Sequence, residues 1–160
     1  MDYQPIPQPS ELTAGEKEDA SGAYLMMFAS VAVGLPLPLL NIIAAIVYYY
    51  TNRSKGNFVR YHSLHSLYSQ LPVSVINSIA VIWTISNFVK DNPFTNSFWG
   101  FVIAAGVFNI AYIIFSIVGA VRAHQGRFYY FLFFGKLAYM QVFRTKQTFK
   151  APIENRPPNW

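Results

Sequence analysis

Three long runs of apolar residues, each without a charged side chain, dominate the chain. They extend over residues 23–50, 67–89 and 98–121. A bilayer core about 30 Å thick is crossed by roughly 20 helical residues, so each run is long enough to span a membrane. The pattern predicts an all-α integral membrane protein with three transmembrane helices. The membrane domain would comprise residues 23–143.

Two prolines interrupt the first run, in the stretch GLPLPLLN. Pro36 and Pro38 each lack a backbone donor, and each disfavours helix at the preceding residue. Two interpretations stay open. The first span is Pro-kinked, which puts the N-terminus outside the cell, or it is a re-entrant hairpin that turns at the prolines, which puts the N-terminus on the cytoplasmic side.

The two ends of the chain are polar and rich in proline. Residues 1–22 are acidic and residues 144–160 are basic, and neither segment has an apolar face to bury, so both are predicted to be disordered tails. They are candidate docking peptides for a partner, through Tyr3, Pro5, Pro7, Pro157, Pro158 and Trp160.

Residues 126–143 form an aromatic segment that contains Lys136 and is too short to span. An interfacial amphipathic helix or hairpin is predicted there. A half-span docked on the helix bundle is the alternative.

Charge gives the predicted spans an orientation. Only 12% of the residues are charged, against about 25% in soluble domains. Basic residues gather in the loop 51–66 and after residue 121, so both segments are predicted to be cytoplasmic and the loop 90–97 to be outside, in a bacterial inner membrane. Because these cations flank the spans, they indicate contact with anionic lipid rather than with nucleic acid.

Signals for catalysis are weak. The chain has no cysteine, which excludes disulfides, thiolate metal sites and cysteine nucleophiles. Acid–base pairs, Gly-rich phosphate loops and nucleophile elbows are missing from the sequence. We therefore expect no enzymatic activity, no cofactor and no small-molecule substrate.

Polar and small residues recur at helical spacing on the predicted spans. The stripe on the second span consists of His62, Ser66, Gln70, Ser74, Asn77 and Ser78. The stripe on the third consists of Ala105, Asn109, Tyr112, Ser116, Gly119, Ala120 and Ala123. Such stripes hold helices together by close approach and by amide hydrogen bonds, or they line a polar cavity.

The stretch FVRYHSLHSL places Arg60, His62 and His65 at the start of the second span. Three roles are possible. A metal site would need three or four ligands, with His124 as the third candidate. A proton relay would need intramembrane acids, which the spans lack. The favoured role is packing, in which Arg60 and His62 anchor the bundle by hydrogen bonds to groups near Gly119–Gly126. The predicted structural and polar-interface residues are Arg60, His62, His65, Gln70, Asn77, Asn109 and Gly126.

Two short motifs carry a family resemblance. NFVRYHSLHSL and VRAHQGRFYY resemble the entry to the second span and the exit from the last span of the Tic-twenty-like membrane proteins, a group that includes a chloroplast inner-envelope translocon component and bacterial relatives. The usual proline of the exit segment is missing, and the translocon members have one more N-terminal span. The resemblance implies a non-catalytic subunit of a membrane complex, with other membrane-protein subunits as partners and a role in protein translocation or membrane insertion.

A small oligomeric transporter or channel is the alternative function. In that protein Gln70, Asn77 and Asn109 would line a polar path between the helices.

Overall fold

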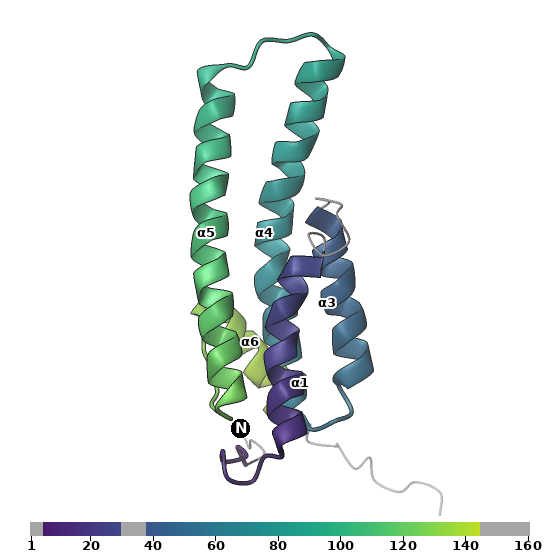
Figure 1. Cartoon of the computed structure of the whole chain (residues 1–160), viewed down its shortest axis with the longest axis vertical. Coiled ribbons are helices and arrows are strands. Elements are labelled where there is room, and N and C mark those ends of the chain that lie inside the picture. Colours follow the sequence, from purple (N-terminus) through teal and green to yellow (C-terminus); the bar gives the residue numbers. More distant parts are fainter. Residues whose placement is uncertain (1–4, 30–37, 145–160) are drawn as a thin grey trace, which may run out of the picture.

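The computed structural model describes residues 5–29 and 38–144, and every regular element in these ranges is helical (Figure 1). The elements in chain order are α1 (Ala14–Leu25), the short 3-10 helix η1 (Met26–Phe28), α3 (Pro38–Asn52), α4 (Asn57–Val89), α5 (Asn96–His124) and α6 (Leu132–Phe143). Among the described residues, α4 and α5 are long and apolar enough to cross a membrane. The all-α prediction is therefore confirmed, whereas the count of three spans is not.

Helix α1 lies in a segment for which the sequence predicted disorder. Thr13 and Glu16 form a capping box, in which the Thr13 side chain accepts from the Glu16 amide at 3.2 Å and Glu16 Oε2 accepts from the Thr13 amide at 2.9 Å. This arrangement pairs amides that a helix N-terminus otherwise leaves without partners. The helix then buries Ala20, Ala23 and Tyr24. Residues 14–22 are thus part of the folded domain, and the tail prediction is wrong for them.

The first apolar run is divided between α1, η1 and α3, which lie side by side (Figure 1). The hydroxyl of Tyr48 in α3 donates to the carbonyl of Asp19 in α1 at 2.7 Å. Beyond the end of α3, Lys55 forms an ion pair with Asp19 at 2.8 Å. The start of α1 and the end of α3 therefore lie at the same end of the molecule. Pro36 lies outside the described residues, and Pro38 begins α3, a position that tolerates proline because its missing donor is not needed there.

Helix α4 is the central element. It begins ten residues before the predicted span, so Arg60, His62 and His65 are helical. Its first half is enclosed by α1, α3 and α6, and nearly every side chain from Phe58 to Ser66 is buried. Its second half extends with α5 beyond the other helices as a long hairpin (Figure 1). Among the residues of α4 that follow Ser74, only Asn87 is buried.

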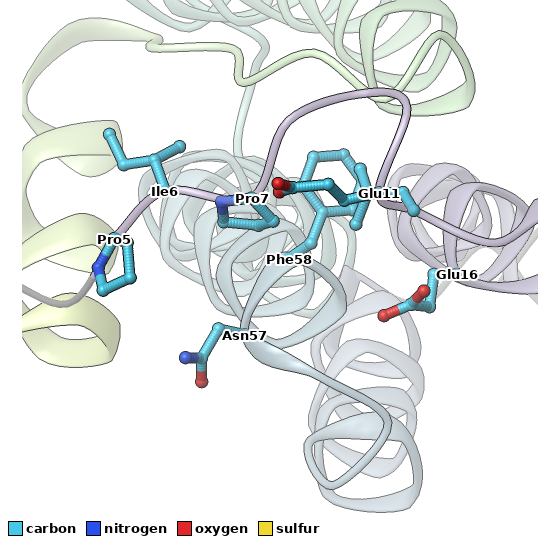
Figure 2. A pocket seen from close by; sticks show the side chains of 8 residues that line it. Pro5, Ile6, Pro7, Glu11, Glu16, Asn57 and Phe58 are labelled. Atoms are coloured by element: carbon cyan, nitrogen blue, oxygen red, sulfur yellow. The ribbon is translucent and has the colours of Figure 1, made fainter.

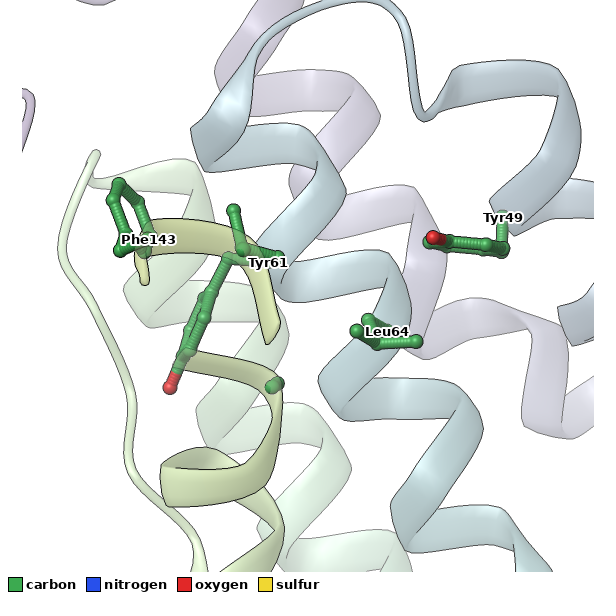
Figure 3. Close-up of a cluster of buried hydrophobic side chains, with 6 residues drawn as sticks. Tyr49, Tyr61, Leu64 and Phe143 are labelled. Atoms are coloured by element: carbon green, nitrogen blue, oxygen red, sulfur yellow. The ribbon is translucent and has the colours of Figure 1, made fainter. Parts of the chain in front are cut away.

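Helix α6 packs against the first half of α4. Tyr61 and Leu64 of α4 form an apolar cluster with Phe143 of α6 and Tyr49 of α3 (Figure 3). The hydroxyl of Tyr61 also donates to the carbonyl of Tyr129 at 2.8 Å, which fixes the connection that leads into α6. Residues 132–143 of the aromatic segment thus form a short helix docked on the bundle, with Leu132 and Phe133 left exposed.

Candidate functional site

The two histidines of FVRYHSLHSL meet a tyrosine from α1. Tyr24 Oη lies 2.9 Å from His62 Nδ1 and 2.8 Å from His65 Nδ1. His62 and His65 are three residues apart on α4, which places both rings on one face of the helix. The three side chains are at most 3% exposed. We call these three residues the Tyr–His cluster.

The proton count of the Tyr–His cluster sets its hydrogen bonding. The phenol of Tyr24 keeps its proton, because its burial disfavours the charged phenolate. It can donate that proton to one Nδ1 only, and it must accept from the Nδ1–H of the other ring. While both imidazoles are neutral, His62 and His65 are therefore in opposite tautomers.

The far nitrogens of the two rings are less well paired. Within the described residues neither Nε2 atom has a hydrogen-bond partner, although the backbone of Arg127 faces His62 and that of Phe131 faces His65. The rings of Phe128 and Tyr129 lie against His62 and His65, with centroids 5.8 and 6.0 Å apart. The connection between α5 and α6 thus closes the cluster off from solvent.

Helix α5 approaches the cluster through a glycine. A Cβ at Gly119 would lie 2.7 Å from Cε1 of Tyr24, closer than real side chains come. The buried residues of α5 include Tyr112, Ser116, Gly119 and Ala123 from the predicted stripe. Part of this stripe therefore receives α1, an element that the sequence analysis had not identified.

Further polar contacts continue along α4. Ser66 Oγ donates to the carbonyl of Ala23 at 2.8 Å, and Gln70 Nε2 donates to Ser66 Oγ at 3.2 Å. The Ser66 bond thus connects α4 to the Ala23 carbonyl near the end of α1.

The amides of Asn77 and Asn109 pair across α4 and α5. Asn77 Nδ2 donates to Asn109 Oδ1 at 2.9 Å, and Asn109 Nδ2 donates to Asn77 Oδ1 at 2.7 Å. Asn109 Nδ2 also donates to the carbonyl of Ala105. The pair connects the two long helices at a level between the Tyr–His cluster and the loop 90–95.

The remaining predicted residues lie elsewhere. Within the described residues Arg60 Nε has no hydrogen-bond partner, and His62 Nδ1 bonds to Tyr24 of α1. The anchoring of Arg60 and His62 to groups near Gly119–Gly126 stays a prediction. Gly126 is buried with φ +73°, a conformation that favours glycine, and Pro9 and Lys17 pack over it. His124 is exposed and does not join His62 and His65. Within the described residues no group of three histidines and acids could hold a metal ion.

The N-terminal segment lies over the start of α4. Pro5 and Pro7 line a shallow pocket with Phe58, Asn57 and the side chains of Glu11 and Glu16 (Figure 2). The two carboxylates already accept hydrogen bonds from the segment itself, Glu11 from the Gln8 amide and Glu16 from Thr13. The other predicted tail residues, Tyr3, Pro157, Pro158 and Trp160, lie outside the described residues.

Sequence reasoning missed Tyr24. The available signal was the T-x-x-E motif at Thr13–Glu16, which is typical of a helix N-terminus. The later turns of this helix carry Tyr24, which is buried. Nothing local indicated that its hydroxyl would meet both histidines, because those residues are 38 and 41 positions away.

A comparison with protein families corrects the resemblance. The model of the magnetosome magnetite crystal formation protein family, MamF/MmsF, matches residues 18–138, which include α4, α5 and the Tyr–His cluster. No curated protein and no solved structure matches the chain. The Tic-twenty-like assignment rested on two short motifs and is wrong, and so are the translocon and protein-transport functions drawn from it. The transporter or channel alternative gains no support from the match either. The chain belongs to the magnetosome magnetite crystal formation protein family.

Proposed function

We propose that the protein is a non-enzymatic component of the magnetosome membrane that contributes to the formation of the magnetite crystal. The observation that carries this proposal is the family match over residues 18–138. The matched segment includes most of α4 and α5, the two helices among the described residues that are long and apolar enough to span a membrane.

In the proposed arrangement α5 and the second half of α4 cross the membrane as a hairpin, and α1 and α3 enter it from one side only. Large apolar side chains, such as Ile82, Ile103 and Val107, are exposed along this hairpin, which favours contact with lipid. Arg53, Lys55 and Arg127 lie at the end of the molecule opposite the loop 90–95 (Figure 1). By the positive-inside rule, this basic end faces the cytoplasm. The loop 90–95 would then face the interior of the magnetosome.

A structural role for the Tyr–His cluster supports the non-enzymatic part of the proposal. Its three side chains are closed off by α1, α5 and the segment 127–131, so a substrate would have to unpack two helices to reach them. Hydrogen bonds between elements distant in sequence are what a scaffold needs.

The test is deletion of the gene in the cells that carry it, followed by electron microscopy of the magnetite crystals. We expect crystals of altered size or number, restored by the wild-type gene and by Gly106→Ala, because a Cβ at that exposed position meets no neighbouring atom. Antibody detection in isolated magnetosomes provides the location. Crystals indistinguishable from the wild type, or a protein missing from the magnetosome membrane, would contradict the proposal.

A further inference from the structure

A groove runs along the outer face of α5 at its C-terminal end. Its lining consists of Ile117, Val118, Val121, Arg122, Gln125 and Arg127. At 100° per residue, positions 117, 121 and 125 lie opposite the buried Ser116, Gly119 and Ala123, which face the rest of the protein. The groove therefore opens away from the bundle.

Two arginines border the polar end of this groove. The chain turns back at Gly126, and the Arg127 amide donates to the Arg122 carbonyl at 2.9 Å, so one tight turn carries both side chains. Both residues are exposed. Within residues 5–29 and 38–144 the one ion pair joins Lys55 to Asp19, which leaves the charges of Arg122 and Arg127 without a carboxylate partner in this part of the chain.

The other end of the groove is apolar. Ile117, Val118 and Val121 are 52%, 39% and 51% exposed. They belong to the last turns of the stretch 98–121, which has no charged residue. With a helical rise of about 1.5 Å per residue, this stretch is long enough to reach from one side of a bilayer core to the other. Arg122 therefore follows at the level where lipid headgroups begin.

We propose that this groove binds an anionic phospholipid. Arg122 and Arg127 hold the phosphate by charge-assisted hydrogen bonds, and an acyl chain lies along Ile117, Val118 and Val121. A zwitterionic lipid fits less well, because its own ammonium group offsets the phosphate charge that two arginines would otherwise meet. A free phosphate ion would leave the apolar half of the groove empty.

The proposal requires α5 to span a membrane, as proposed above, but it does not depend on a role in crystal formation. Flotation of the purified full-length protein with liposomes tests the insertion separately. Unaltered crystals in the deletion strain would leave the lipid site standing, and a failed lipid site would leave the crystal phenotype standing.

The experiment is native mass spectrometry of the full-length protein in detergent, titrated with phosphatidylglycerol or phosphatidylcholine. We expect phosphatidylglycerol to bind with at least about tenfold lower Kd, equivalent to about 1.4 kcal/mol. The double variant Arg122→Gln/Arg127→Gln should bind the two lipids alike. The control Arg53→Gln/Lys136→Gln also loses two exposed cations, from the loop after α3 and from α6, and should keep the preference.

Three results would overturn the proposal: equal affinity of the wild-type protein for the two lipids, an undiminished preference in the Arg122/Arg127 variant, or an equal loss of preference in the control. Excess inorganic phosphate supplies a further arm. If phosphate alone displaces phosphatidylglycerol completely, the groove is an oxyanion site rather than a lipid site. The far-ultraviolet circular dichroism of each variant verifies that its helices are intact.

Discussion

Tyr24 shows how much of this fold depends on single side chains. Its hydroxyl joins α1 to two turns of α4, and its ring lies against the bare backbone of α5 at Gly119. His62 and His65 were singled out from the sequence because polar rings at the start of an apolar helix need partners. The partner itself could not be predicted, since a phenol 38 residues away becomes a neighbour only after the first apolar run has folded back.

Tyr24→Phe tests the hydrogen bonds of the Tyr–His cluster. The substitution keeps the ring but removes the one group that both Nδ1 atoms contact, which leaves buried polar atoms without partners. We expect the free energy of unfolding in detergent to fall by about 1–3 kcal/mol. Tyr50→Phe is the control, because Tyr50 is 59% exposed, and it should unfold like the wild type. Equal stability of the two variants would show that the cluster contributes nothing to the fold.

At the scale of the elements, the sequence predicted α5 well and α1 poorly. The stripe of small and polar residues on α5 indicated a contact face, and Ala105, Ser116, Gly119 and Ala123 are indeed buried. Helix α1 escaped prediction because its first turns carry Glu16, Lys17, Glu18 and Asp19, a composition that also suits a disordered tail. Its burial comes from tertiary contacts of Ala20, Ala23 and Tyr24, which no local pattern reports.

The packing of α1 on α5 is tested by Gly119→Ala. The added methyl group would lie 2.7 Å from the Tyr24 ring, so α1 must shift and the cluster must loosen. We expect a loss of about 1–3 kcal/mol in unfolding free energy, the usual cost of overpacking. Gly106→Ala, on the same helix and with no atom within 4 Å of the new methyl group, should be neutral or slightly stabilising. A Gly119→Ala variant as stable as Gly106→Ala would contradict the close approach of α1.

The Asn77–Asn109 pair predicts a measurable coupling between α4 and α5. A double-mutant cycle with Asn77→Ala and Asn109→Ala should give an interaction energy of about 0.5–1.5 kcal/mol, the range found for polar contacts between membrane helices. Thr84→Ala is the control partner for Asn77→Ala. Its hydroxyl bonds within its own helix, to the Ala80 carbonyl, so the two changes should be additive. Additivity in the asparagine cycle would mean that the amides do not stabilise each other.

At the scale of the whole molecule, the count of membrane crossings was the part that hydropathy alone could not decide. Residues 23–50 are as apolar and as long as a span, yet the structure divides them between helices that lie side by side. Length and composition measure only whether a segment can remain in a bilayer, and a hairpin with both ends on one side passes the same test as a single crossing. The contacts that bring these helices together, Tyr48 with Asp19 and Lys55 with Asp19, join residues that are far apart in sequence.

The fold therefore predicts which side of the membrane the N-terminal segment lies on, and a three-span protein would have this segment on the other side. Residues 5–13 lie near the start of α4, at the end of the molecule that also carries the loop after α3, whereas the loop 90–95 lies at the other end (Figure 1). The chain has no cysteine, so single cysteines can be introduced at Ser10, Ser54 and Asn92. In sealed, isolated magnetosomes an impermeant thiol reagent should label Ser10→Cys and Ser54→Cys, and it should reach Asn92→Cys only after the membrane is permeabilised.

A protein with three crossings would behave differently. One span would separate Ser10 from Ser54, and two spans would separate Ser10 from Asn92, so Ser10 and Asn92 would lie on the same side of the membrane. Protection of Ser10→Cys together with labelling of Ser54→Cys would thus restore the single first span, and the reverse labelling of Ser54 and Asn92 would overturn the proposed orientation.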